Sequence, residues 1–443
     1  MGALILLWPA LWNAYPLVFS DTNAFLTQGI LGFFVWDKPF VYGPWMALFH
    51  WQYSLWFVAV MQALIVSSIL WLTTGFMRQY GMLHALAPAG CNVPVRNDGL
   101  FHYLMVCMVL AVVTAAPWFT SLLMPDIFAP ITVLCLFLLA CHTTMSRTVR
   151  AWVLLVASFA IASHLSHLVI AAAVLLIVAL FKFRRLKLAI LPLFFALLLL
   201  VCTNLYGFQK FAVSPFGSVF MLARLAADGH ILPVLKLQCA DKSLHLCSWQ
   251  ERLPTDSDEF MWSGQGPVWS HPGGPIGLAP EATKLILAAV IADPLGVVRS
   301  LVRNTGTQLL MIGLGDTLAD DHLDLTVGAR LKSDFPLAEQ ERYRNARQLQ
   351  RSLLPSVQIF NWLGRISLFV GLVLTSFLLW RAWVKKDRVL TVLIMMVLMG
   401  LLANAFATGA LSKPNYRYQT RIAWLLVFVP LIVPFRASKP TRL

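Results

Sequence analysis

The side chains best suited to chemistry in this sequence are charged residues beside long apolar runs. Asp21 directly follows the first apolar run, and Arg417 and Arg421 directly precede the last one. A carboxylate at the edge of a membrane is costly unless it has a partner or a function, and the arginine fork matches phosphate oxygens. Two ordinary roles stay open: Asp21 as a solvent-facing helix cap, and the two arginines as anchors among lipid headgroups.

Three further groups of polar residues fall near predicted helix ends. The stretch 37–44, which contains Asp37, Lys38 and Tyr42, leads into an aromatic segment typical of a membrane interface. Asp126 opens an apolar run, where it is either a helix cap or a functional group. His164 and His167 share a helix face if helical, which suits a metal, a structural hydrogen bond or a substrate contact.

The composition predicts which kind of fold must position these residues. Of 443 residues, 59% are hydrophobic and only 12% are charged, about half the charged fraction of an ordinary soluble protein. This excludes a soluble globular domain, a disordered chain and a disulfide-dense secreted module, and predicts an all-α polytopic membrane protein. The apolar runs predict ten transmembrane helices near 3–19, 52–75, 101–118, 127–145, 151–163, 168–182, 188–205, 357–380, 389–408 and 422–435.

The distribution of basic residues predicts the orientation. Nearly all of the net charge of +14 falls in segments 77–99, 146–150, 182–187, 381–388 and 436–443. By the positive-inside rule these segments are cytoplasmic, as are both termini, in a bacterial-type inner membrane. The charge therefore needs no nucleic-acid partner. The first run lacks a basic leader and a small-residue cleavage site, so we expect a retained span rather than a signal peptide.

The same topology predicts three domains. Residues 1–205 form an N-terminal transmembrane bundle, 206–356 a large extracytoplasmic loop domain of mixed structure, and 357–443 the C-terminal transmembrane helices. Cys239 and Cys247 lie in the loop domain, where an oxidising compartment favours a disulfide over two free thiols. The acidic run 316–324 is read as a solvated turn, with a divalent cation as the alternative. No cofactor is predicted.

Motifs at both ends of the chain resemble the GT-C superfamily of membrane glycosyltransferases, which includes protein O-mannosyltransferases and aminoarabinose transferases of lipid A. Ser20-Asp21-Thr22 stands where the family carries a catalytic acidic residue. Lys38-Pro39-Phe40-Val41-Tyr42-Gly43-Pro44 is similar to a Pro-rich, Tyr-containing stretch of the family, in a looser form. Arg417-Tyr418 precedes the last apolar run, as in the family. The resemblance covers the first 50 and last 30 residues and the overall topology.

This resemblance implies an inverting glycosyltransferase with Asp21 as general base. The donor is a polyprenyl-phosphate-linked sugar, the acceptor a glycan, lipid or protein, and membrane lipids surround both. Arg417 and Arg421, with Lys210 as a further candidate, stabilise the phosphate that leaves. The residues predicted to bind substrate are Asp37, Lys38, Tyr42, Asp126, His164, His167, Lys210, Tyr416, Arg417, Tyr418 and Arg421.

Other classes of protein stay open from the sequence. A transporter or flippase for lipid-linked glycans would place charges in mid-membrane, and few lie there. A non-catalytic envelope assembly protein would use the large loop to bind a partner. A phosphoethanolamine transferase would need a metal cluster and a Thr nucleophile in a large soluble domain, and the acidic run 316–324 is the nearest approach to such a cluster.

Overall fold

The computed structural model describes residues 1–86, 99–239 and 244–433. Their regular structure is entirely helical, apart from one isolated bridge between Leu17 and Leu122, so the all-α prediction is confirmed. Residues 87–98 of the predicted cytoplasmic segment 77–99, and all of the predicted segment 436–443, lie outside the described residues.

Six helices among the described residues are long and apolar enough to cross a membrane, or seven if the bent pair α13 (Ser218–Ala227) and α14 (Ile231–Gln238) is one span. This indicates a multi-pass membrane protein. The six are α5 (Trp56–Leu86), α10 (Leu165–Lys182, continued by α11, Leu186–Ala189), α12 (Leu191–Phe208), α16 (Gly274–Ala292), α20 (Leu354–Val384) and α21 (Arg388–Ala405, continued by η7, Phe406–Ala410).

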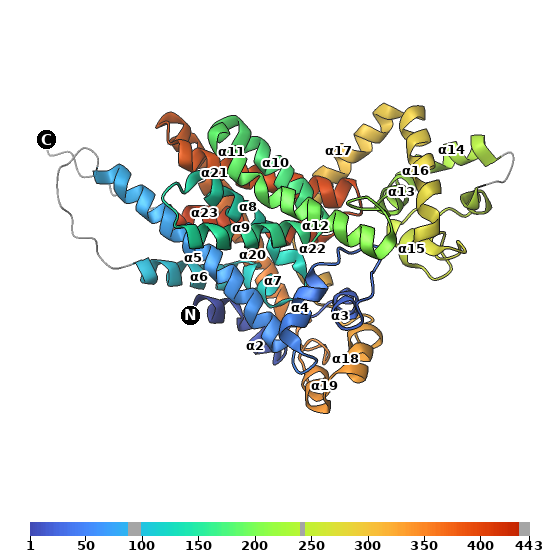
Figure 1. The fold of residues 1–443 in the computed structure, drawn as a ribbon, viewed down its shortest axis with the longest axis horizontal. Helices are drawn as coiled ribbons and strands as arrows, with labels where there is room; N and C mark the ends of the chain where they lie inside the picture. The colour runs from blue at the N-terminus through green and yellow to red at the C-terminus, as the bar shows by residue number, and fades with distance from the viewer. Residues whose placement is uncertain (87–98, 240–243, 434–443) are drawn as a thin grey trace.

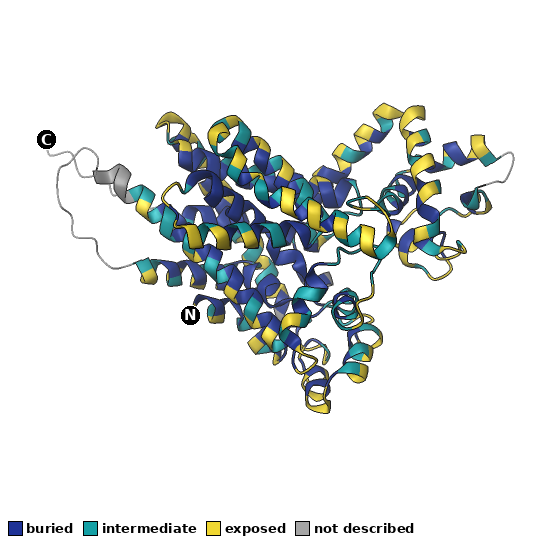
Figure 2. Ribbon diagram, in the orientation of Figure 1, coloured by how far each residue is buried: buried dark blue, intermediate teal, exposed yellow. Residues whose placement is uncertain are grey.

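Several of these helices present apolar side chains outward. On α20, Phe369, Trp362 and Trp380 are each more than 60% exposed, and exposed residues run along the outer helices in Figure 2. A soluble protein rarely leaves so continuous an apolar surface in water. This surface is therefore suited to contact with lipid.

The ten predicted spans are not confirmed. The first run, 3–19, folds as two short helices, α1 (Gly2–Leu6) and α2 (Trp8–Asn13). Helix α2 ends before Ala14, which has a left-handed backbone conformation (φ 63°). The last run is divided between α22 (Tyr416–Ala423) and α23 (Leu425–Ile432). These segments are too short to cross as single straight helices, since about 20 residues are needed.

Three further predicted spans correspond to helices of 14 to 16 residues, fewer than the about 20 needed to cross a membrane. They are α6 (Gly99–Val113), α8 (Phe128–Cys141) and α9 (Arg147–Ala162). All 14 residues of α8 are buried, so it is the central core helix of the bundle, surrounded by other helices. Its uniform apolarity reflects burial on all sides, which hydropathy alone does not distinguish from contact with lipid.

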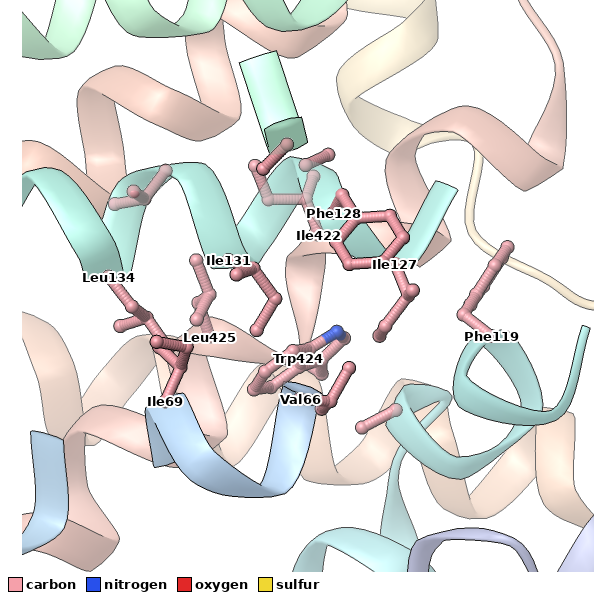
Figure 3. Packing of buried hydrophobic residues seen from close by; sticks show 14 of the residues in the cluster. Val66, Ile69, Phe119, Ile127, Phe128, Ile131, Leu134, Ile422, Trp424 and Leu425 are labelled. Carbon is pink, nitrogen blue, oxygen red and sulfur yellow. The ribbon is translucent and has the colours of Figure 1, made fainter. Parts of the chain in front are cut away.

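Side chains of α5, α8, α22 and α23 interlock in this core. Figure 3 shows Trp424 lying among Val66, Ile131 and Leu425, and the indole of Trp424 is 1% exposed. Its Nε1 donates a hydrogen bond to the carbonyl of Arg421 at 2.9 Å. The core therefore holds the break between α22 and α23 in place.

A second core belongs to a lobe at one end of the bundle, formed by α13, α14, α15 (Ser257–Trp262), α16 and α17 (Pro294–Leu310) (Figure 1). Cys239 and Cys247 are joined in it by a disulfide with a Cα–Cα distance of 5.4 Å. The lobe lies within the predicted loop domain 206–356, but that domain is not confirmed as a purely extracytoplasmic unit because α16 is as apolar as a span. The remaining helices of that stretch, α18 (Ala329–Asp334) and α19 (Leu337–Arg344), lie near α3 (Figure 1).

The helices of the first loop, α3 (Thr22–Leu31) and α4 (Tyr42–His50), approach each other at two glycines. A Cβ on Gly43 would lie 2.5 Å from the carbonyl oxygen of Phe25, and one on Gly29 would lie 2.5 Å from the carbonyl oxygen of Gly43. This close approach holds the segment that follows Asp21 against the segment that follows Lys38.

We predict that Gly43→Ala lowers the free energy of unfolding by about 1–3 kcal/mol, the usual cost of overpacking. Tryptophan fluorescence of the purified chain during heating in detergent measures the effect as a lower Tm. Gly75→Ala is the matched control, because a Cβ there meets no atom within 4 Å. Equal Tm values for the two variants would contradict the close packing of α3 and α4.

Candidate functional site

A cavity of about 270 Å³ opens between the bundle and the lobe. Four segments that are far apart in the sequence contribute to its walls: the first loop, the turn between α9 and α10, the lobe, and the loop that leads into α22. Its principal lining residues are Asp21, Phe25, Asp37, Lys38, Ser163, His164, Ser166, Phe220, Trp262, Thr408, Arg417 and Tyr418.

Asp21 lies at the start of α3 but does not cap it. Its side chain accepts no hydrogen bond from the helix, so the solvent-facing cap is not its role. The carboxylate instead lies 3.3 Å from Nζ of Lys38 and 3.9 Å from Nη2 of Arg417. The side chain is one-third exposed (33%) and lines the cavity. A carboxylate held this way is directed at whatever occupies the cavity.

Lys38 connects the two carboxylates of the first loop. Its Nζ donates to Oδ2 of Asp37 at 2.6 Å and also contacts Asp21. The backbone supports this geometry, because Nε2 of Gln28 donates to the carbonyl of Lys38 at 3.2 Å. Asp21 and Asp37 are far apart in the sequence, but Lys38 therefore contacts both of their carboxylates.

Charge and burial compete to set the protonation of this group. Burial raises the pKa of Asp21, but Lys38 and Arg417 lower it more, so the net pKa lies below its usual value. Burial lowers the pKa of Lys38, and Asp21 and Asp37 outweigh that effect, so the net pKa lies above its usual value. At neutral pH Asp21 is therefore a carboxylate and Lys38 a cation.

Arg417 enters the cavity from the first turn of α22. Asn415 caps this helix by accepting from the backbone N–H of Arg417 at 2.9 Å. The guanidinium lies over the ring of Phe19, with Cζ 4.3 Å from the ring centre. Among the described residues, its Nε and Nη1 have no hydrogen-bond partner. Its Nη2 donates to the hydroxyl of Tyr418 at 3.4 Å, so Nε and Nη1 are the donors that stacking and charge leave without a hydrogen bond.

A fully buried ion network lies beneath the cavity floor. Oδ1 of Asp126 is 3.2 Å from Nη1 of Arg421 and 3.7 Å from Nε of Arg417. Nη2 of Arg421 also donates to Ser166 at 2.7 Å and to Oδ1 of Asn404 at 2.8 Å. Arg421 is 0% exposed, so it is not a headgroup anchor. Asp126 and Arg421 do not line the cavity. Asp126 pairs with both Arg417 and Arg421.

The predicted histidine pair falls at a helix break. His164 begins α10, and its Nδ1 accepts from the backbone N–H of Ser166 at 3.2 Å. His167 is buried, and its Nδ1 donates to the carbonyl of Ala160 at 2.7 Å. Of the two, His164 lines the cavity and His167 does not. Within the described residues, no three His, Cys, Asp or Glu side chains are grouped to hold a metal ion.

The other residues predicted to bind substrate also divide into those that line the cavity and those that do not. Tyr418 lines the cavity. Tyr42 is buried behind it and donates to Oε1 of Gln62 at 2.7 Å. Lys210 and Tyr416 are exposed and do not line the cavity. Tyr42 therefore supports the packing of α4, and Lys210 and Tyr416 lie outside this cavity.

Sequence reasoning missed the aromatic wall that the lobe contributes. Phe220 stacks on Trp36 at 5.5 Å between ring centres, and Trp262 lies 6.1 Å from both. No local pattern marks these rings, because they meet the bundle only after the lobe folds against it. Asn404, a polar residue inside an apolar run, was the one missed group with a signal in the sequence.

The acidic run 316–324 lies apart from the cavity. Oδ2 of Asp320 is 2.8 Å from Nε of the exposed Arg351, and His322 adopts a left-handed backbone conformation (φ 62°). This segment does not line the cavity.

The chain was compared with known proteins at three levels. It matches no protein-family model, no curated protein and no solved structure.

We predict that Arg421→Met lowers the free energy of unfolding by about 3–5 kcal/mol, because it leaves Asp126 buried without its closest cation. Thermal unfolding in detergent measures the effect. Arg351→Met is the matched control, since Arg351 also pairs with an aspartate but is exposed. Its Tm should stay at the wild-type value. A wild-type Tm for Arg421→Met would show that the network does not stabilise the bundle.

Proposed function

We propose that this chain is an integral membrane glycosyltransferase that moves a sugar from a polyprenyl-phosphate donor to an acceptor on the extracytoplasmic side. The observation that carries the proposal is the meeting of Asp21, Lys38 and Arg417 in one cavity, with Asp21 within 4 Å of both cations. A carboxylate beside two cations suits a reaction that needs a base and expels a phosphate. The resemblance of both chain ends to the GT-C superfamily supports the same reaction.

The proposed step is a direct displacement with inversion. The acceptor oxygen forms a bond to the anomeric carbon, and its proton passes to the carboxylate of Asp21. The bond between that carbon and the phosphate oxygen breaks, and its electron pair leaves with the polyprenyl phosphate. Lys38 and Arg417 stabilise the charge that develops on the phosphate. Asp37 holds Lys38 in place through its 2.6 Å contact.

The position of the cavity supports a lipid-linked donor. Ala407 and Thr408 of η7, at the end of α21, contribute to its wall, and α21 is apolar enough to span a membrane. A polyprenyl chain in the bilayer can thus lie beside the bundle while its phosphate enters the cavity. Phe220 and Trp262 provide aromatic faces on the opposite wall, which suits the apolar face of a sugar. We place the cavity at the outer face of a bacterial-type inner membrane, with both termini cytoplasmic.

We predict that Asp21→Asn lowers the rate of sugar transfer by about 100- to 10,000-fold, the usual contribution of a general base. The same variant still binds undecaprenyl phosphate in lipid nanodiscs, because it keeps Lys38 and Arg417. Arg417→Met loses that binding. Native mass spectrometry measures bound undecaprenyl phosphate, and transfer is followed with a panel of undecaprenyl-phosphate sugars.

Glu251→Gln is the matched control for these measurements, because Glu251 is exposed on the lobe and does not line the cavity. It keeps both binding and transfer. Full transfer by Asp21→Asn would exclude Asp21 as the base. Unchanged binding of undecaprenyl phosphate by Arg417→Met would exclude the phosphate site.

The charges around Asp21 predict a pH effect. Because its pKa lies below the usual value, the wild-type enzyme keeps its base ionised well into the acid range, and activity falls only as pH drops through that lowered pKa. Lys38→Met removes the largest effect that lowers the pKa, so the acid limb of kcat/KM moves to higher pH. Lys236→Met, at an exposed site on α14, leaves it in place. If the acid limb of Lys38→Met stayed at the wild-type pH, the group that titrates in that limb would not be Asp21.

A further inference from the structure

The helices α16 and α17 form a hairpin that projects away from the bundle (Figure 1). Asp293 joins them, and its side chain accepts from the backbone N–H of Gly296 at 2.8 Å. One face of α16 packs into the lobe through Leu278, Ala282 and Leu285, which are all 0% exposed. The inner face of α17 is also buried, at positions such as Val297. Each helix therefore leaves its opposite face without a partner among the residues that the structure describes.

That opposite face is apolar. Each of its large side chains is more than half exposed, and they follow one another along the bend between the two helices: Leu287, Ile291, Leu295, Val298, Val302 and Leu310. The exposed surface of these helices can be followed in Figure 2. At about 25 cal/mol per Å² of apolar surface, leaving such a stripe in water is unfavourable. We call these six residues the hairpin stripe.

The charges beside the stripe favour a lipid surface as its partner. Lys284 and Arg299 are exposed next to it, and Arg303 is 63% exposed in its pair with Asp228. Of the acidic groups of the hairpin, Glu281 accepts from the backbone N–H of His245, and the exposed Asp293 at the bend is engaged as the cap of α17. An apolar stripe flanked by outward cations is typical of a helix at the boundary between headgroups and acyl chains.

The hairpin is also continuous with the membrane-spanning part of the chain. The carboxyl-terminal half of α17 packs on η7, where the backbone of Asn304 and the side chain of Gln308 lie against Gly409. Since η7 continues the candidate span α21, the base of the hairpin lies at the end of a span. Of the two hairpin helices, only α16 is apolar enough to cross a membrane, so the pair does not fit a two-span insertion.

We infer that the α16–α17 hairpin lies in the outer boundary of the membrane that the bundle spans, with the hairpin stripe against the acyl chains and Lys284 and Arg299 among the headgroups. None of the stripe residues lines the cavity, so the inference can be tested without replacing a residue of the reaction proposed above.

The test is lipid crosslinking of the full chain in nanodiscs of phosphatidylcholine and phosphatidylglycerol. Leu295→benzoylphenylalanine and Ile291→benzoylphenylalanine place a photoreactive group on the stripe, at sites that are 77% and 72% exposed and so tolerate the change. On irradiation, both variants gain the mass of one lipid. Leu337→benzoylphenylalanine is the control: it is 74% exposed on α19, a helix rich in charged residues, and gains no lipid.

Three results would overturn the inference. A crosslink to a second copy of the chain at Leu295 would show that a protein interface covers the stripe. Absence of a lipid adduct at both Ile291 and Leu295 would place the hairpin in water. Equal lipid adducts at Leu295 and Leu337 would show that the stripe lies no closer to lipid than the charged helix α19 does.

Discussion

The arrangement of this molecule depends on one buried carboxylate, Asp126, and the two arginines that it pairs with. A cation in a protein interior must be compensated, because the cost of removing it from water is several kcal/mol. Asp126 meets Arg421 at 3.2 Å and Arg417 at 3.7 Å, so it connects the start of α8 to α22. Since Arg421 is satisfied below the cavity, only Arg417 projects into it.

The charges around the cavity are balanced, and that balance has a consequence for ligand binding. Asp21 and Asp37 carry two negative charges, and Lys38 and Arg417 carry two positive ones. An incoming phosphate therefore competes with Asp21 for the cations. The contact of Asp21 with Arg417 is the longest of the group, at 3.9 Å, and is thus the one most easily exchanged. If a phosphate replaced Asp21 as the partner of Arg417, the carboxylate of Asp21 would lie beside the phosphate. A general base needs such a position.

Hydropathy predicted most of the long helices because each needs only its own sequence to be recognised, but it did not predict α16, which lies in the predicted loop domain, as a span. It predicted spans that are not confirmed where burial and lipid contact have the same signature, as in α8, and where a local break divides an apolar run, as at Trp424. Asp21 and Arg417 were recognisable as candidates because a charge beside an apolar run is costly, and Lys38 because it lies in the Pro-rich stretch 37–44. Tyr42 and His167 were not distinguishable from them, since only the tertiary structure shows which side of a helix faces the cavity.

The aromatic wall and the hairpin illustrate what only long-range packing can specify. Nε2 of Gln308 on α17 donates to the carbonyl of Asn415 at 2.8 Å, and Oε1 of the same side chain accepts from the N–H of Asn415 at 2.9 Å. Asn415 in turn caps the helix that carries Arg417. One amide therefore links the hairpin to the cavity. Because this link uses both ends of the amide, a displacement of α17 must strain the cap, so the position of the hairpin and that of the guanidinium are coupled through Asn415.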